Sequence, residues 1–321
     1  MTAPLPSRLT FGQPVEFNGL AIAPIYRAPD QSPLSYLTLD TAFDQADIKI
    51  TETSDSGSVP ELRFENKAKL PVLLLDGEEL IGAKQNRVVN LTILVPPSCS
   101  LVIPVSCVES GRWNYSSQNF GRTDRAHFAR GRAKKMASVS RSLKQSGSHR
   151  SDQGEVWSEI DRKFAAMNVQ SNTSAMADMY QDTAPTLDGY VDEFQPDANQ
   201  VGAFYFVHGR FVGMEAFDQS DTFAALNGKL VKSYAIDVLE TRPSDRRRAS
   251  LSDAISFIES LEDGDWESYE SVGMGRDRRL LSTQAASAAL EAEGKVIHLS
   301  GFMNEEESMG YRPGQRRKRS L

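Results

Sequence analysis

The 321-residue sequence predicts an α+β fold built mainly on antiparallel sheets. Three observations lead to this prediction. Short β-branched runs separated by Pro, Gly, Asn and Asp fill the first hundred residues. Amphipathic helical patterns occupy the middle and the last third of the chain. Four further strand patterns with short turns then form a C-terminal meander, and the sequence shows no repeat at the periods of solenoids or propellers.

Composition is that of a water-soluble globular protein, with 40% hydrophobic and 25% charged residues and a net charge of −7. The longest apolar runs are far shorter than the ~20 residues of a membrane span, and the N-terminus lacks the apolar core of a secretory signal. Cys99 and Cys107 flank one predicted strand and would lie roughly 26 Å apart, too far for a disulfide. We therefore expect a cytoplasmic protein.

The N-terminal part is predicted to contain one helix, over Leu37–Asp47. Strands are predicted over Phe17–Ala23, Ile48–Thr53, Leu62–Asn66, Val72–Leu75, Val88–Val95 and Ser100–Val108. In the last of these, Cys99 and Cys107 fall on the apolar face, so we interpret both as small core residues rather than catalytic thiols. Pro104 predicts an edge strand or a bulge.

Residues 121–150 carry nine basic residues and a single acid, Asp124. We interpret this region as a basic, solvated and mobile segment, with Ser138–Ser151 as a loop. Clustered cations can bind nucleic-acid phosphates, yet the few aromatic residues here and the acidic balance of the whole chain disfavour that partner. Helices are predicted to follow over Gly154–Met167, Ala175–Gln181 and Asp188–Phe194.

The last third begins with a predicted hairpin, in which His208-Gly209 forms the turn between two strands. Its strands are Ala203–Val207 and Phe211–Phe217, two helices follow over Asp221–Lys232 and Leu251–Leu261, and the meander comprises Trp266–Val272, Arg279–Ser282, Ala286–Glu291 and Val296–Phe302. Ser250 and Asp253 predict a capping box on the second helix. We expect one domain over residues 11–303 and a polar, disordered tail over 304–321.

Two polar segments stand inside otherwise apolar sequence. After the turn signal Asp76-Gly77, the chain continues through Glu78 to four consecutive polar residues at 84–87, which suit either a ligand site or a solvated loop. The second segment, Ser106–Trp113, places a carboxylate, a guanidinium and an indole after a core strand. Its structural alternative is a local Glu109–Arg112 ion pair beside a Trp113 that covers the core.

Other catalytic and metal-binding signatures are absent from the sequence. The four histidines and two cysteines form no metal-ligand motif, although a site built of carboxylates alone is not excluded. His298 lies in an apolar strand pattern and is interpreted as a core or edge histidine. The sequence contains no Gly-x-Gly-x-x-Gly, no Walker loop and no Gly-x-Ser-x-Gly element, which disfavours Rossmann, P-loop and serine-hydrolase chemistry.

The two polar segments resemble a bacterial family, the ADP-ribosylglycohydrolase and rhodanese-phosphatase associated protein domain. The resemblance rests on Asp76-Gly77-Glu78, Gly82-Ala83-Lys84-Gln85-Asn86-Arg87 and Cys107-Val108-Glu109-Ser110-Gly111-Arg112-Trp113. Ser271–Arg279 also looks like a family element, so the resemblance covers most of Phe11–Phe302. It implies a role in NAD and ADP-ribose metabolism, with an NAD-derived nucleotide such as ADP-ribose or its phosphate as partner. It specifies neither a reaction nor a cofactor.

The matched residues suit such a ligand chemically. The ligand-binding candidates are Lys84, Gln85, Asn86, Arg87, Arg112 and Trp113, and the candidates for a general acid or base are Glu78 and Glu109. Cations would meet the pyrophosphate and the indole would stack on adenine. The alternative function is a non-catalytic scaffold that binds a partner protein. We expect Arg87 and Glu109 on neighbouring strands at one sheet end, either in a ligand site or as a structural pair.

Overall fold

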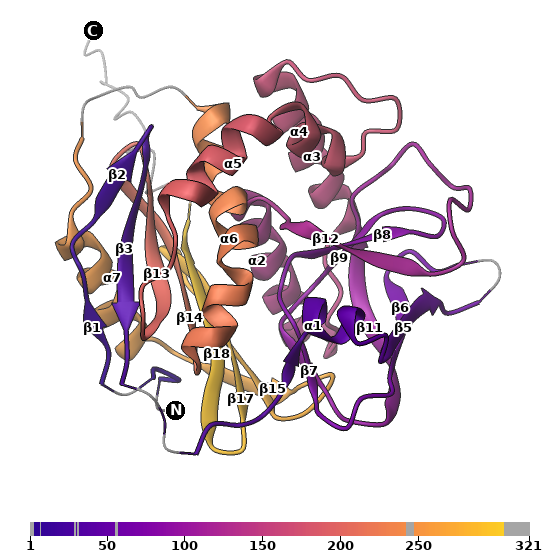
Figure 1. Ribbon diagram of the computed structural model, residues 1–321, viewed down its shortest axis with the longest axis horizontal. Coiled ribbons are helices and arrows are strands. Elements are labelled where there is room, and N and C mark those ends of the chain that lie inside the picture. The colour runs from indigo at the N-terminus through magenta and orange to yellow at the C-terminus, as the bar shows by residue number, and fades with distance from the viewer. Residues whose placement is uncertain are drawn as a thin grey trace, which may run out of the picture.

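The computed structural model describes residues 3–6, 8–28, 30, 32–54, 57–241 and 247–304. Within that part, a large antiparallel sheet and two smaller sheets lie on either side of central helices (Figure 1). The predicted α+β class is confirmed. Apart from Asn304, the predicted tail lies outside the described residues.

The large sheet has the strand order β1-β3-β13-β14-β18-β17-β16-β15, and β2 also pairs with β3. Its strands are β1 (Thr10–Phe11), β2 (Val15–Phe17), β3 (Leu20–Tyr26), β13 (Gln200–Val207), β14 (Arg210–Phe217), β15 (Glu267–Glu270), β16 (Arg276–Leu281), β17 (Ala285–Ala292) and β18 (Lys295–Met303). The N-terminal strand β3 therefore lies beside β13 from the last third of the chain. The predicted turn is confirmed, since His208 and Gly209 adopt φ angles of 49° and 74°.

The smaller sheets come from the first half of the chain. One has the order β12-β8-β9-β11-β6-β5 and the other β10-β7-β4, in which β4 and β7 are parallel. Their strands are β4 (Leu37–Thr38), β5 (Ile48–Glu52), β6 (Glu61–Asn66), β7 (Val72–Leu74), β8 (Glu78–Gly82), β9 (Arg87–Val89), β10 (Ile93–Val95), β11 (Cys99–Cys107) and β12 (Phe120–Ala126). The edge-strand prediction for Pro104 is wrong, because β11 lies between β9 and β6. Pro104 is the last residue paired with β6 and Val105 the first paired with β9, so its missing N–H falls where the strand changes partner.

The helices are α1 (Leu39–Asp44), α2 (Ala129–Ser146), α3 (Gln153–Met167), α4 (Met176–Asp182), α5 (Ala184–Glu193), α6 (Ser220–Glu240) and α7 (Leu251–Glu262). The helix predicted from Leu37 starts two residues later, because Leu37 and Thr38 pair with β7 and Thr38 caps the helix. The capping box predicted for α7 is also wrong. The Ser250 side chain makes no capping bond, and Asp253 accepts from Arg247 at 2.6 Å instead.

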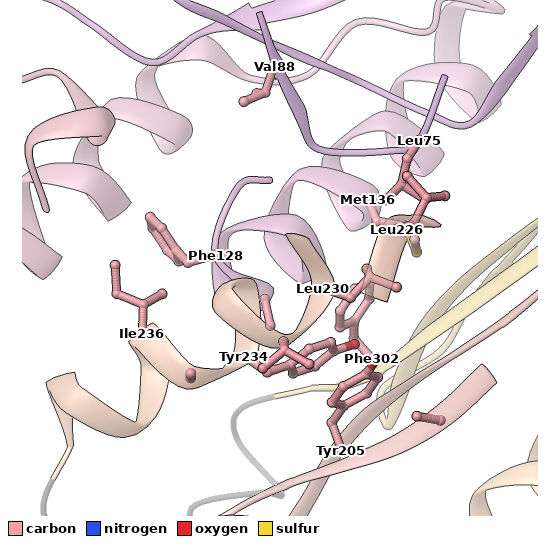
Figure 2. Packing of buried hydrophobic residues seen from close by; sticks show 14 of the residues in the cluster. Leu75, Val88, Phe128, Met136, Tyr205, Leu226, Leu230, Tyr234, Ile236 and Phe302 are labelled. Atoms are coloured by element: carbon pink, nitrogen blue, oxygen red, sulfur yellow. The ribbon is translucent and has the colours of Figure 1, made fainter. Parts of the chain in front are cut away.

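Three hydrophobic clusters fill the spaces between these layers. The largest packs α2 and α6 against the large sheet and includes Phe128, Met136 and Phe302 (Figure 2). At its centre, Tyr205 of β13 stacks on Tyr234 of α6 with ring centroids 3.8 Å apart. A second cluster covers the other face of the large sheet with α7, and the third fills the smaller sheets. The central helices therefore join the two sheet systems.

Residues 121–150 are folded rather than mobile, which corrects the sequence-based interpretation. They contribute most of β12 and all of α2, so the loop predicted over Ser138–Ser151 is helical as far as Ser146. Each of the nine basic residues forms an ion pair with an acidic side chain: Arg122, Arg125, Arg130, Arg132, Lys134, Lys135, Arg141, Lys144 and Arg150. Their charges thus serve internal contacts.

None of the described helices combines the length and apolar character that crossing a membrane requires.

Candidate functional site

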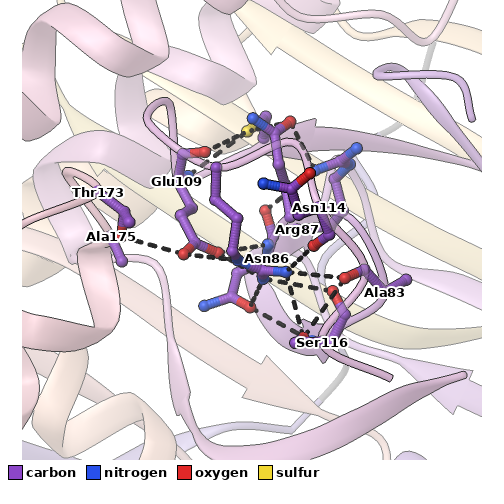
Figure 3. A network of polar contacts seen from close by, with 12 residues as sticks. Ala83, Asn86, Arg87, Glu109, Asn114, Ser116, Thr173 and Ala175 are labelled. Carbon is purple, nitrogen blue, oxygen red and sulfur yellow. Dashed lines mark hydrogen bonds and ion pairs between the residues drawn. The ribbon is translucent and has the colours of Figure 1, made fainter. Parts of the chain in front are cut away.

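The predicted segment at residues 84–87 leads from β8 into β9, whose first residue is Arg87, and meets the end of β11. Arg87 pairs with Cys107 in the β9–β11 ladder, and Glu109 follows two residues after that pair. Arg87 and Glu109 thus lie at the same end of neighbouring strands, as predicted. The turn after Glu109 folds over this end, where the backbone N–H of Ser116 donates to the Ala83 carbonyl at 2.9 Å (Figure 3).

Glu109 and Arg112 form a tight pair inside this network. Arg112 donates from Nε and Nη2 to the two carboxylate oxygens, at 2.8 and 2.6 Å. The same carboxylate accepts from the Asn86 backbone N–H at 3.1 Å and from Thr173 Oγ1 at 3.0 Å (Figure 3). Burial raises the pKa of Glu109, but the bonds from Arg112 and Asn86 outweigh it and leave that pKa below its usual range. The contacts therefore suit Glu109 for holding the loop in place.

The structure places Glu78 in a different environment. Its side chain accepts from Lys229 of α6 at 2.5 Å and from the Leu75 backbone N–H at 3.0 Å. Burial raises the pKa of Glu78, and Lys229 opposes this shift. Successive residues of β8 point to opposite sides, and the next residue, Glu79, pairs with Arg125 at 2.9 Å. The two carboxylates predicted to act as acid and base are therefore held by separate sets of partners.

Arg87 is the most unusual residue of the network. Its side chain is 0% exposed, and Nη1 donates to Gln85 Oε1 at 3.2 Å and to the Asn86 carbonyl at 3.4 Å. Nε and Nη2 have no hydrogen-bond partner among the described residues. Those two N–H groups form one edge of the guanidinium, the edge that Arg112 uses to hold both oxygens of Glu109. Arg87 can therefore bind two oxygens of a phosphate or a carboxylate in the same way.

Other side chains converge beside Arg87. The Trp113 ring, which is 44% exposed, lies 5.3 Å from Lys84 Nζ and 5.9 Å from Arg87 Cζ, measured to the ring centroid. A Cβ added to Gly57 would lie 3.1 Å from Lys84 Cδ and 3.4 Å from both Glu52 Oε2 and Trp113 Cζ2. Lys84, Glu52 and Trp113 thus lie together around Gly57, and Arg87 lies beside the Trp113 ring. We call these four residues, Glu52, Lys84, Arg87 and Trp113, the Arg87 site.

Glu52 is the member of the Arg87 site that sequence reasoning missed. It ends β5 and is buried, and neither carboxylate oxygen has a hydrogen-bond partner in the part of the chain that the structure describes. Its charge raises the pKa of Arg87, whereas burial, the larger effect, lowers it. An acidic residue at the end of a strand is common, so the sequence carried no signal for this role. Only the pairing of β5 with β6 brings Glu52 to the site.

Cys107 has the environment of a core residue beside this network. The Cys107 thiol is buried and donates to Gln85 Oε1 at 3.1 Å, and burial raises the pKa of that thiol, which agrees with a core residue. Within the described ranges, no three or more His, Cys, Asp or Glu side chains are grouped so as to hold a metal ion.

Comparison with known proteins gives one finding. A family model, ARPP-1, described as the ARG and Rhodanese-Phosphatase-superfamily-associated Protein domain, matches residues 8–302. The match includes the strands of the large sheet, except for the last residue of β18, and both polar segments that form the network. No curated protein and no solved structure matches the chain.

Proposed function

Because the chain belongs to the ARG and Rhodanese-Phosphatase-superfamily-associated Protein domain family, we propose that it acts in ADP-ribose metabolism by binding an ADP-ribose-like nucleotide at the Arg87 site. The family's name associates it with the ADP-ribosylglycohydrolase and rhodanese-phosphatase superfamilies. The observation that carries the proposal is the buried guanidinium of Arg87, which presents two unpartnered N–H groups on one edge. Buried polar groups in folded proteins are nearly always hydrogen-bonded, so an oxyanion ligand supplies the acceptors that this edge lacks.

The other residues of the site match the remaining parts of such a ligand. An ADP-ribose molecule offers a doubly charged pyrophosphate, ribose hydroxyls and an adenine ring. Arg87 and Lys84 would bind the pyrophosphate, and the half-exposed Trp113 ring would stack on the adenine. The unpartnered carboxylate of Glu52 would accept hydrogen bonds from ribose hydroxyls. Gln85 and Asn86 hold Arg87 in place, and Arg112 acts through Glu109.

Isothermal titration calorimetry with NAD, ADP-ribose and ADP-ribose phosphate tests this proposal. We expect wild-type protein to bind ADP-ribose or its phosphate, and Arg87→Met to weaken that binding at least about 10-fold, which corresponds to ~1.4 kcal/mol. Methionine replaces the guanidinium with an apolar side chain of similar length. Arg63→Met, at an exposed arginine of β6, is the matched control and should bind like wild type.

Two outcomes would contradict the proposal. One is the absence of binding by wild-type protein at millimolar concentrations of all three ligands. The other is equal affinity of Arg87→Met and wild type, because a ligand whose affinity does not depend on Arg87 binds elsewhere.

A further inference from the structure

A second buried polar cluster lies outside the Arg87 site, where the smaller sheets meet α2 and the large sheet. Thr92 immediately precedes β10, His298 belongs to β18 and Glu215 to β14. His298 Nδ1 lies 2.8 Å from Thr92 Oγ1, and His298 Nε2 lies 2.9 Å from Glu215 Oε2. A hydroxyl, an imidazole and a carboxylate therefore form one continuous hydrogen-bonded chain that connects the two sheet systems.

The direction of each hydrogen bond follows from the groups involved. An ionised carboxylate only accepts, so the bond to Glu215 places a hydrogen on His298 Nε2 and leaves Nδ1 as an acceptor in the neutral ring. The Asp76 backbone N–H donates to Thr92 Oγ1 at 3.2 Å, which leaves the hydroxyl hydrogen of Thr92 to point at Nδ1. The order is thus hydroxyl donor, imidazole acceptor and carboxylate, as in nucleophile–base–carboxylate triads.

The imidazole and the carboxylate are both firmly positioned. His298 stacks on Phe217 with ring centroids 4.4 Å apart. Glu215 Oε1 accepts from Arg132 Nη1 at 2.6 Å and from the Tyr234 hydroxyl at 3.2 Å. Burial raises the pKa of Glu215, but Arg132 and His298 outweigh this effect and leave that pKa below its usual range. The carboxylate therefore stays ionised. A base that keeps one tautomer and one orientation is prepared to accept the proton of a hydroxyl.

Exposure to solvent falls along this hydrogen-bonded chain, from Thr92 through His298 to Glu215. Glu215 is 0% and His298 1% exposed, whereas Thr92 is only partly buried. Thr92 and His298 line a small pocket together with Arg279, which is 3% exposed and whose Nη2 has no hydrogen-bond partner among the described residues. The pocket has room for about one water molecule. A partly exposed threonine, a shielded base and an unpartnered N–H donor therefore line the same small pocket.

The geometry points to Thr92 as a nucleophilic hydroxyl, with His298 as its general base, Glu215 as a positioning residue and a small ester as the class of substrate. Thr92 Oγ1 attacks the ester carbonyl carbon while its proton passes to His298 Nδ1. Collapse of the tetrahedral intermediate breaks the carbon–oxygen bond to the alcohol, which leaves with the proton from His298. Water then attacks the acyl-threonine with the same base, releasing the acid and restoring the hydroxyl.

The charges around the pocket favour an ester over a phosphate. Asp76 and Asp277 line it, but Asp76 pairs with Lys135 and Asp277 pairs with Arg279, so the surroundings are close to neutral. A dianionic phosphate buried in such surroundings would keep an uncompensated charge, whereas a neutral carbonyl carries none. The unpartnered Nη2 of Arg279 could then bind the oxygen that becomes negative during the attack. The cavity itself is smaller than an acetyl group, so the ester must reach Thr92 from the partly exposed side of that residue.

Reaction with p-nitrophenyl acetate, followed by intact-mass and peptide mass spectrometry, tests this inference. We expect release of p-nitrophenolate with transient acetylation that maps to Thr92. Thr92→Val should abolish the acetylation and Thr92→Ser should retain it, because serine keeps the hydroxyl. His298→Gln should slow the acetylation about 100-fold or more, which is the usual contribution of a general base. Thr283→Val, at an exposed threonine, should react like wild type.

The position of the acetyl group in wild-type protein, mapped by peptide mass spectrometry, tests the inference even if a variant fails to fold. Absence of an acetyl group on Thr92 of wild type would overturn the inference and leave the Thr92–His298 bond as a structural link. Acetylation of folded His298→Gln at the wild-type rate would also overturn it. Circular dichroism of each variant shows whether it is folded. None of these results depends on nucleotide binding at the Arg87 site.

Discussion

Arg87 combines complete burial with an incomplete set of hydrogen bonds. A buried donor without an acceptor costs about 1–3 kcal/mol, so this residue lowers the stability of the unliganded protein. Proteins commonly accept such a cost at binding sites, where removal of the residue stabilises the fold and abolishes function. The stability of Arg87 variants therefore separates a ligand site from a structural ion pair.

We expect Arg87→Met without ligand to stay within about 1 kcal/mol of wild type or to gain stability, because the substitution removes an unsatisfied buried cation. Urea denaturation followed by circular dichroism measures this. A loss of about 3–5 kcal/mol would instead identify Arg87 as a partner in a structural pair. In the presence of ADP-ribose, only the wild type and the Arg63→Met control should show a rise in melting temperature.

Glu109 should make stability depend on acid pH. Its pKa is lowered in the folded protein, so the unfolded state binds more protons as the pH falls below about 4.3, and the stabilisation present at neutral pH is lost. We expect Glu109→Gln to lose about 1.5–3 kcal/mol at neutral pH and then to lose less than wild type on acidification. Denaturation curves at about pH 7, 5 and 3.5 measure both effects. Parallel pH profiles of the two proteins would contradict this assignment.

Some residues of the candidate site could be predicted from the sequence because they are contiguous. The polar run at 84–87 and the Glu109–Trp113 segment each interrupt apolar strands, and the structure brings these two segments together. Glu52 and Thr92 could not be found in this way. Each is a common residue type at the end or start of a strand, and its neighbours come from distant parts of the chain.

At the scale of elements, α2 shows how buried ion pairs can conceal a core helix. Its buried face includes Arg132 and Lys135, which pair with Glu215 of the large sheet and with Asp76 in the turn between β7 and β8. Those basic residues make the helix resemble a solvated segment, because the acidic partners lie 59 and 83 residues away in sequence. By contrast, strands such as β6 and β11 were predicted closely, since the alternation that defines them is local.

Two lysines of α2 provide a test of this structural role. Lys135 is buried and donates to Asp76, Val89 and Asn90, whereas Lys144 is exposed and pairs with Glu267 at the surface. We expect Lys135→Met to cost about 3–5 kcal/mol, because it leaves the buried Asp76 carboxylate with only a 3.8 Å contact to Arg132. Lys144→Met should change stability little. Thermal and urea denaturation measure both, and similar effects of the two substitutions would contradict a core position for α2.

Over the whole molecule, the central helices join the two sheet systems into one unit. Separation of the sheet systems would leave either Asp76 or Glu215 without its partner on α2, depending on which side keeps the helix. Uncompensated buried charges are strongly destabilising, so a state with one sheet system folded and the other separated is unfavourable. The molecule should therefore unfold in a single cooperative transition.

The fluorescence of two tryptophans reports separately on the unfolding of the two sheet systems. Trp266 is buried behind α7 on the large sheet, and Trp113 lies at the Arg87 site. We expect variants that retain only one of them, with the other tryptophans replaced by phenylalanine, to show the same fluorescence midpoint in urea. Circular dichroism of the same samples is the control for global unfolding. Midpoints that differ by more than the experimental error would show that the sheets unfold independently.

The pairing of β3 with β13 also determines the order in which a nascent chain can fold. Ile22 pairs with Tyr205, a separation of 205 − 22 = 183 residues. At about 5–20 residues per second, a ribosome needs roughly 10–40 s to synthesise the segment between them. The smaller sheets lie within residues 37–126 and can form during that interval. The earliest strands of the large sheet thus wait with unpaired edges for partners made much later, a period in which a nascent chain benefits from a chaperone.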